Sequence, residues 1–118
     1  MLRSLISSLT IATSPLVGAH TTRWFQPIME LPRTAIHTFT CIIWAESRST
    51  WEHPNLTDNN RWGSSGIFQI EQGTWAVWAA RVGLHMKVWQ ASPYQQALGA
   101  ASIWRHDGFA PWRWDGCV

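Results

Sequence analysis

Residues 34–47, TAIHTFTCIIWAES, carry the pattern that decides the fold. Apolar side chains recur within one arc of roughly 120° when successive residues advance about 100° around a helix. They are Ile36, Phe39, Ile42 and Ile43. The spacing predicts an amphipathic helix, and the domain proper is expected to begin near Thr34. Glu46 lies in the middle of the same apolar arc, and Cys41 lies to one side of it.

The residues after this helix favour turns. Residues 52–66, EHPNLTDNNRWGSSG, are rich in proline, asparagine and glycine, which predicts turns with at most a short hairpin. A brief apolar run, GIFQI, follows at residues 66–70. A second helix is predicted over residues 74–82, with Gly83 placed to end it. Its residues at helical spacing are Trp75, Trp78 and Val82.

The clearest helix start in the sequence is Ser92. Pro93 suits the first helical position, and Gln95 completes a Ser-x-x-Gln capping box. This helix should run to about Asp107, with Gly108 as its stop. One side of it is shared by Tyr94, Leu98, Ala101 and Arg105, with Ile103 and Trp104 nearby.

Three helical segments around a small turn-rich insertion predict a mainly helical α+β domain. A chain of 118 residues has room for one such domain, expected at residues 34–118. Residues 20–33 contain two prolines and no helical periodicity, which predicts a connecting segment. Residues 1–19 combine an early arginine, a moderately apolar middle and a small residue at the end, as in a secretory signal. A loosely ordered tail is the alternative interpretation of this segment.

Composition excludes several classes of function. The formal net charge is only +2 and the arginines are scattered, so no basic stripe is available to follow a nucleic acid. The five histidines show no metal-ligand spacing, so neither a metal site nor a cofactor is expected. The N-terminal segment is too polar for a transmembrane helix, which needs about 20 predominantly apolar residues. No membrane span is therefore expected.

The two cysteines allow two interpretations. If Cys41 and Cys117 pair, the bond encloses most of the domain and contributes about 4 to 5 kcal/mol by the chain-entropy estimate. A pair of this kind fits an exported protein. The alternative is two buried free thiols in a reducing compartment.

Glu46 is the leading candidate for chemistry. A carboxylate on the apolar side of a helix is costly when ionised and dry, so it is paired, protonated or at the rim of a cleft. Partly apolar surroundings raise the pKa of such an acid and let it protonate a leaving-group oxygen near neutral pH. The tryptophans that would supply these surroundings are Trp44, Trp51, Trp62 and Trp75. The alternative is a glutamate at a frayed helix end that points to solvent.

Several motifs together resemble a known superfamily. CIIWAES at residues 41–47, followed by Trp51 and by Gly66, Phe68 and Gln69 in GIFQI, resembles the catalytic stretch of lysozymes. EQGTW, SPYQQALGAASIW, DGFAPW and the terminal cysteine resemble the branch of resuscitation-promoting factors and transglycosylase-like domains. The resemblance covers residues 41–117 and implies a lysozyme-like fold.

The resemblance implies cleavage of the β-1,4 bond between N-acetylmuramic acid and N-acetylglucosamine in peptidoglycan. Glu46 would then protonate the glycosidic oxygen. Gln69 and Thr74 would bind sugar or an attacking hydroxyl, although Thr74 also suits a helix cap. The remaining expected substrate contacts are Ser47, Trp51 and Trp62. Trp51 and Trp62 are as well suited to packing as to binding, whereas Trp78 and Trp104 are expected to pack.

The chain departs from the family pattern in two ways. In resuscitation-promoting factors a cysteine directly precedes the catalytic glutamate, whereas Cys41 stands five residues before Glu46, as in animal-type lysozymes. Animal-type lysozymes carry a catalytic aspartate where this chain has Ser64. Asp58 is the nearest candidate for a second carboxylate. Without a second carboxylate, the substrate's own hydroxyl can trap the sugar cation, and this lytic transglycosylase reaction is favoured over hydrolysis.

The leading hypothesis is therefore a secreted or cell-wall-associated monomer that cleaves peptidoglycan glycan strands. A phage-borne lysin would use the same chemistry. The alternative from another class is a glycan-binding or signalling module that keeps the cleft without turnover.

Overall fold

The helix predicted around Glu46 is present. In the computed structural model, which describes residues 23–56 and 63–118, helix α3 spans Arg33–Ser47. Its buried side consists of Ala35, Phe39, Ile42, Ile43 and Ser47. The helix ends because Arg48 adopts a left-handed backbone conformation (φ 59°, ψ 32°) that turns the chain away from the axis.

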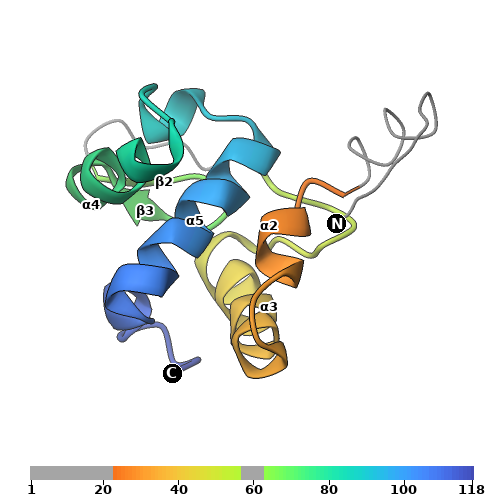
Figure 1. The fold of residues 1–118 in the computed structure, drawn as a ribbon. Helices are drawn as coiled ribbons and strands as arrows, with labels where there is room; N and C mark the ends of the chain where they lie inside the picture. Colours follow the sequence, from red (N-terminus) through yellow and green to blue (C-terminus); the bar gives the residue numbers. More distant parts are fainter. Residues whose placement is uncertain (1–22, 57–62) are drawn as a thin grey trace, which may run out of the picture.

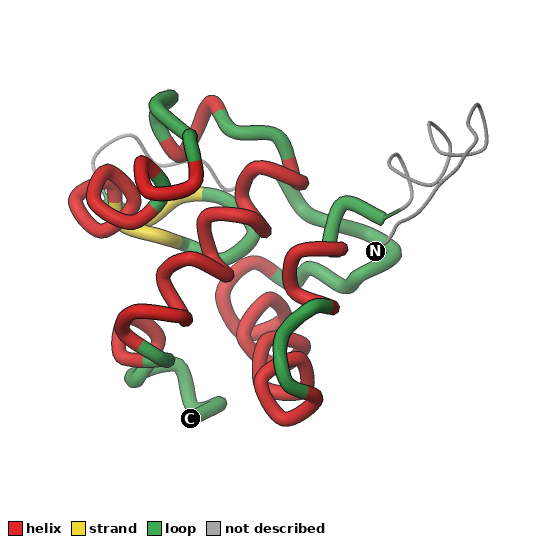
Figure 2. The backbone as a smooth tube through the Cα atoms, viewed as in Figure 1, coloured by secondary structure: helices red, strands yellow, loops and turns green. Residues whose placement is uncertain are grey.

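The described residues form a mainly helical architecture with one small two-stranded sheet, as the sequence predicts (Figure 2). The other elements are α2 (Gln26–Met29), β2 (Ser64–Ser65), β3 (Ile70–Glu71), α4 (Gln72–Trp78), η1 (Ala80–Val82), η2 (Val88–Gln90), α5 (Pro93–Asp107) and η3 (Ala110–Trp112). Helix α5 lies in the middle of the molecule, with α2 and α3 on one side and α4 with the two strands on the other (Figure 1). Both α2 and α4 pack on α5.

The predicted hairpin is short. Strand β2 pairs with β3 in antiparallel register, with Ser64 opposite Glu71 and Ser65 opposite Ile70. The connecting turn begins at Gly66, whose φ is 82°, and ends at Gln69, whose φ is 48°. A Cβ atom at position 66 would also overlap the side chain of Gln96. Glycine is therefore required at this position for two independent reasons.

The core begins earlier in the chain than the sequence predicts. Trp24, Ile28 and Leu31 are buried in the same cluster as the residues of α3, so the described residues ahead of Thr34 belong to the domain. The connecting segment expected at residues 20–33 is thus corrected from residue 23 onward. Helix α2 in this segment is a single turn, which is too short to produce a recognisable periodicity in the sequence. Pro27 lies in its first turn, where the backbone N–H that proline lacks would have no partner within the helix.

Helix α5 starts and stops where the sequence predicts. The Ser92 hydroxyl accepts the Gln95 N–H at 3.2 Å, and the Gln95 side chain accepts the Ser92 N–H at 2.8 Å. Its buried side, however, is made mostly of small residues, whereas Tyr94 and Arg105 are exposed. The buried residues are Gln96, Ala97, Gly99, Ala100, Ala101, Ser102 and Ile103. Small side chains let neighbouring elements approach the backbone of this central helix closely.

Helix α4 is shorter than predicted and is followed by a separate turn of 3-10 helix. It begins at Gln72, two residues before the expected start, and η1 continues the chain to Gly83, which ends it in a left-handed conformation (φ 81°). The N-cap of α4 is Glu71, so Thr74 lies inside the first turn and does not cap the helix.

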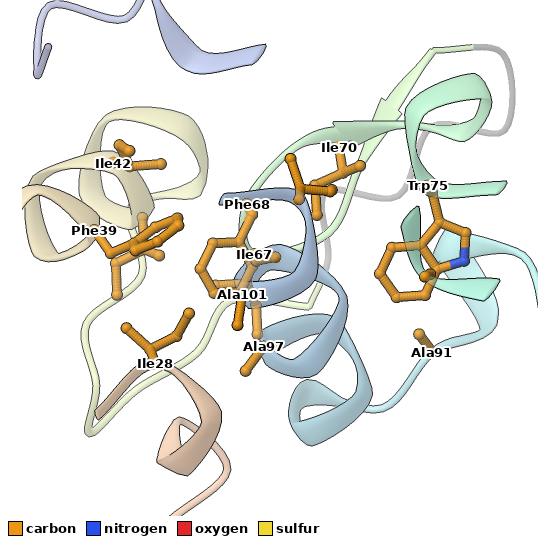
Figure 3. Packing of buried hydrophobic residues seen from close by; sticks show 14 of the residues in the cluster. Ile28, Phe39, Ile42, Ile67, Phe68, Ile70, Trp75, Ala91, Ala97 and Ala101 are labelled. Atoms are coloured by element: carbon orange, nitrogen blue, oxygen red, sulfur yellow. The ribbon is translucent and has the colours of Figure 1, made fainter. Parts of the chain in front are cut away.

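Aromatic rings hold the two sides of the core together. Phe39 of α3 packs edge-on against Phe68 of the hairpin, with ring centroids 5.7 Å apart, and Trp75 of α4 fills the opposite side (Figure 3). The two fully enclosed indoles both have hydrogen-bond partners. Trp75 donates to the Met86 carbonyl at 2.9 Å, and Trp112 donates to the Phe68 carbonyl at 2.8 Å.

Gly99→Ala tests this close packing. A Cβ atom at Gly99 would lie 2.8 Å from Cη2 of Trp75 and nearer still to Cζ3, and Trp75 is fully buried and cannot move aside. We expect a loss of about 1–3 kcal/mol in the free energy of unfolding, measured by urea denaturation. Gly73→Ala on α4 is the matched control, because its Cβ meets nothing within 4 Å and should be neutral or stabilising. Equal effects of the two substitutions would contradict the packing argument.

Among the helices of residues 23–56 and 63–118, none is long and apolar enough to cross a membrane.

Candidate active site

Glu46 lies on the last turn of α3 and lines a cavity of about 380 Å³. The other lining residues are Ala45, Pro111, Trp112, Trp114 and Asp115. Helix α3 thus supplies one wall, and the C-terminal segment after α5 supplies the opposite wall. The side chain of Glu46 is half-buried, so it reaches solvent from partly apolar surroundings.

A second carboxylate, Asp115, stands beside Glu46. Burial, then the hydrogen bond and the negative charge of Asp115, raise the pKa of Glu46 from 4.5 to about 7. Asp115 Oδ2 is buried, and no N–H or O–H group of the described residues donates to it. Two carboxyl groups can share a hydrogen bond only if one of them carries a proton. With its pKa raised to about 7, Glu46 retains its proton closer to neutral pH than an ordinary glutamate does.

The disulfide holds Asp115 in this position. Cys41 on α3 is bonded to Cys117, with Cα atoms 5.8 Å apart, which confirms the predicted pair and leaves no free cysteine. Asp115 Oδ1 accepts the Cys117 N–H at 3.0 Å, and the Asp115 N–H donates to the Trp112 carbonyl at 3.2 Å. The carboxylate is thus tied to the crosslinked residue of its own segment.

A second cavity of about 440 Å³ adjoins the first. Two predicted site residues, Gln69 and Thr74, line it together with Ser64, Asp107 and Arg113. Pro111 and Trp114 line both cavities and form the wall between them. The structure therefore brings Gln69 and Thr74 together but places Glu46 on the other side of this wall.

Ser47 is corrected from a substrate contact to a structural residue. It is buried, and its hydroxyl donates to the Ile67 carbonyl at 2.8 Å and lies 2.6 Å from the Ser49 hydroxyl. The Asn55 side chain also donates to the Ser47 carbonyl at 2.8 Å. These bonds join the end of α3 to the hairpin and to the following loop, and so fix the direction in which the last turn presents Glu46.

Trp51 packs and lines neither cavity. Its ring lies 5.5 Å from those of Trp24 and Phe25, and its Nε1 donates to the Thr40 hydroxyl at 2.9 Å. These contacts agree with packing, and the expectation that Trp51 contacts substrate stays a prediction. Two other candidates, Asp58 and Trp62, lie outside the described residues.

The tryptophans expected to pack are partly buried against the core. Trp78 is also held by polar partners: its Nε1 donates to Asp107 at 3.0 Å, and the His106 ring stacks on it with centroids 4.2 Å apart. Asp107 and Glu71 both line the second cavity, so Trp78 helps to hold one of its two carboxylates in place.

Sequence reasoning missed Asp115 and Trp114. A usable signal was present, because both lie within three residues of Cys117, and a bond to Cys41 brings that segment to the helix of Glu46. Five helical residues span only about 7.5 Å, so Glu46 lies close to the segment that is bonded to Cys41.

The described residues contain no group of three or more histidine, cysteine, aspartate or glutamate side chains able to hold a metal ion. In comparisons with known proteins, no family model, curated protein or solved structure matches this chain.

Proposed function

We propose that this protein cleaves glycosidic bonds of a polysaccharide, with Glu46 as the general acid. The observation that supports this most is that Glu46 lines a cavity and that the pKa of its carboxyl group is raised to about 7. A general acid is most effective when its pKa lies near the working pH. The motifs at residues 41–47 and 66–75 favour the β-1,4 bond of peptidoglycan as the substrate.

The position of Asp115 favours a reaction without water. Glycosidases that hydrolyse with two carboxylates place them on opposite sides of the scissile bond, about 5 to 9.5 Å apart. Asp115 instead lines the same cavity as Glu46, and the two carboxyl groups interact with each other. Glu46 would protonate the leaving oxygen as the C–O bond breaks. The sugar's own hydroxyl would then bond to the anomeric carbon and return its proton to Glu46, giving an anhydro sugar.

The two cavities together fit a glycan chain that lies across Trp114. This indole is 85 % exposed and forms part of the wall of both cavities. Aromatic faces suit the apolar faces of sugar rings, and polar groups such as Gln69, Thr74 and Asp107 are available for sugar hydroxyls. The strand would enter over the second cavity and place one glycosidic oxygen at Glu46.

Trp114→Ala is expected to weaken the binding of a soluble peptidoglycan tetrasaccharide by about two- to tenfold, since an aromatic contact contributes about 0.5–1.5 kcal/mol. Calorimetric titration of the variant measures this. Trp44→Ala is the matched control, because Trp44 is 53 % exposed and lines neither cavity. Each of these indoles also lies 5.3 Å below an arginine guanidinium, Arg48 over Trp44 and Arg113 over Trp114. Equal losses for both variants would argue against a platform at Trp114.

Mass spectrometry of the products released from purified peptidoglycan tests the proposed function. Anhydro-muropeptides, each lighter by one water than the hydrolysis product, would support the transglycosylase reaction. Reducing-end products would mean hydrolysis and direct attention to Asp58. Glycan binding without product release would favour the alternative, a binding or signalling module. The disulfide is consistent with the secretion expected from residues 1–19, which lie outside the described residues.

A further inference from the structure

We propose that Asp115 is a positioning residue for Glu46: the two carboxyl groups share one proton, and the Cys41–Cys117 disulfide keeps them in contact. The inference rests on the proposed function for its catalytic meaning, but the shared proton itself is a property of the folded chain. Asp115 lines the same cavity as Glu46 and acts through it.

The hydrogen bonds of Asp115 assign different tasks to its two oxygens. Oδ1 accepts the Cys117 N–H and orients the carboxylate. Oδ2 is buried and accepts no hydrogen bond from the described residues. A protonated Glu46 carboxyl group beside it could supply the missing donor. A buried carboxylate oxygen without a donor is costly, so the geometry favours the state in which the pair holds one proton and one negative charge.

Among residues 23–56 and 63–118, neighbouring cations do not offset this charge by direct pairing. The arginines that follow Glu46 and precede Asp115 most closely in these segments are Arg48, at the C-cap of α3, and Arg113. Each guanidinium lies over a tryptophan and donates to a backbone carbonyl, Arg48 to Trp44 at 2.9 Å and Arg113 to Ala110 at 2.7 Å. Asp107, the other described aspartate, lines the adjoining cavity and accepts from Trp78.

The pair suits both halves of the proposed reaction. In the first half, the shared proton passes to the leaving-group oxygen as the glycosidic C–O bond breaks. Two negative carboxylates then lie in contact, and their repulsion raises the proton affinity of Glu46. In the second half, Glu46 takes the proton of the sugar hydroxyl that bonds to the anomeric carbon. The pair is restored, and no water is consumed.

Carbon-13 NMR titration of the glutamate side chains tests the shared proton without any need for activity. The chain contains four glutamates, and Glu46→Gln identifies the signal of Glu46. In Asp115→Asn the new amide keeps the shape, and its carbonyl oxygen can still accept the Cys117 N–H. Its NH₂ group favours ionised Glu46, so the pKa of Glu46 should fall from about 7 toward 4.5. Glu30→Gln, which removes an exposed negative charge, should leave the pKa of Glu46 unchanged.

A pKa of Glu46 that stays near 7 in folded Asp115→Asn would overturn the proposal, because burial alone would then explain it. If this variant does not fold, the same titration is carried out on the wild-type chain with and without a reductant. Breaking the disulfide should lower the pKa of Glu46 in the same direction, and an unchanged pKa in folded, reduced protein would again overturn the proposal.

The pH profile of cleavage separates positioning from general damage. In Asp115→Asn the limb of kcat/KM at high pH should move to lower pH, with a loss of about tenfold or more at pH 7 and near-normal activity at pH 5. A uniform loss at every pH would indicate a structural role and contradict the proposal. If wild type cleaves nothing, the proposed function fails, whereas the titration still decides whether the pair shares a proton.

Discussion

Glu46→Gln is expected to lower the rate of glycan cleavage by about 10² to 10⁴-fold while the fold is retained. The amide preserves the shape of the side chain but has no acidic proton to give to the glycosidic oxygen. Release of soluble muropeptides from peptidoglycan measures the rate, and circular dichroism with thermal unfolding verifies the fold. A folded variant that keeps more than about a tenth of the wild-type rate would exclude Glu46 as the general acid.

Glu52→Gln is the matched control for this substitution. Glu52 is exposed and lines neither cavity, so its amide variant should cleave at the wild-type rate. A loss of activity in both variants would indicate a general effect of net charge on binding.

The same Glu46→Gln variant has a second readout in the pH dependence of stability. The pKa of Glu46 is about 7 in the folded chain and near 4.5 in the unfolded chain, so the folded state binds the proton more tightly. Its contribution to stability is full below pH 4.5 and is lost as the pH rises through about 7. The glutamine variant should lack this decline. Parallel stability curves for the two proteins between pH 4 and 8 would contradict the raised pKa.

Loss of the Cys41–Cys117 bond is expected to have the largest effect on stability. The bond closes a loop of 76 residues, and the chain-entropy estimate gives about 4 to 5 kcal/mol for a loop of this size. Urea unfolding of the wild type and of a Cys41→Ser, Cys117→Ser double variant measures the difference. Cleavage should fall as well, because the freed segment carries Trp114 and Asp115 away from Glu46.

The double serine variant supplies its own control. A reductant should lower the melting temperature of the wild type and have no effect on the variant. A melting temperature that is the same with and without reductant in the wild type would show that the bond contributes nothing measurable.

Local signals in the sequence were sufficient for the parts of the fold that depend on local physics. The arc of apolar residues in α3 and the Ser92 capping box of α5 predicted both helices closely, since spacing and caps are short-range properties. The buried side of α5 was not predicted. Its contacts are made by Gly99 and alanines, and these small residues carry no hydrophobic signal until Trp75 is known to pack on them.

The candidate site could be predicted only in part, because some of its residues are brought together by contacts between distant segments. Glu46 lies on a helix whose pattern marks its position, and Gln69 and Thr74 follow from motifs. Asp115 joins Glu46 only through contacts between segments that are far apart in the chain, which spacing along the sequence does not reveal. The structure also separates Gln69 and Thr74 from Glu46 by a wall that belongs to this same distant segment.

The distance along the chain between α3 and residue 117 has a consequence for the order of folding. Helix α5, its cap and the hairpin depend on contacts between near neighbours and can form early, whereas the contact of Glu46 with Asp115 requires closure of almost the whole domain. A collapsed chain with a formed core but an open C-terminal segment would hold Glu46 as an ordinary, ionised carboxylate. The pKa of Glu46 would thus be raised only when folding and disulfide formation are complete. Partly folded molecules would have no cleavage activity.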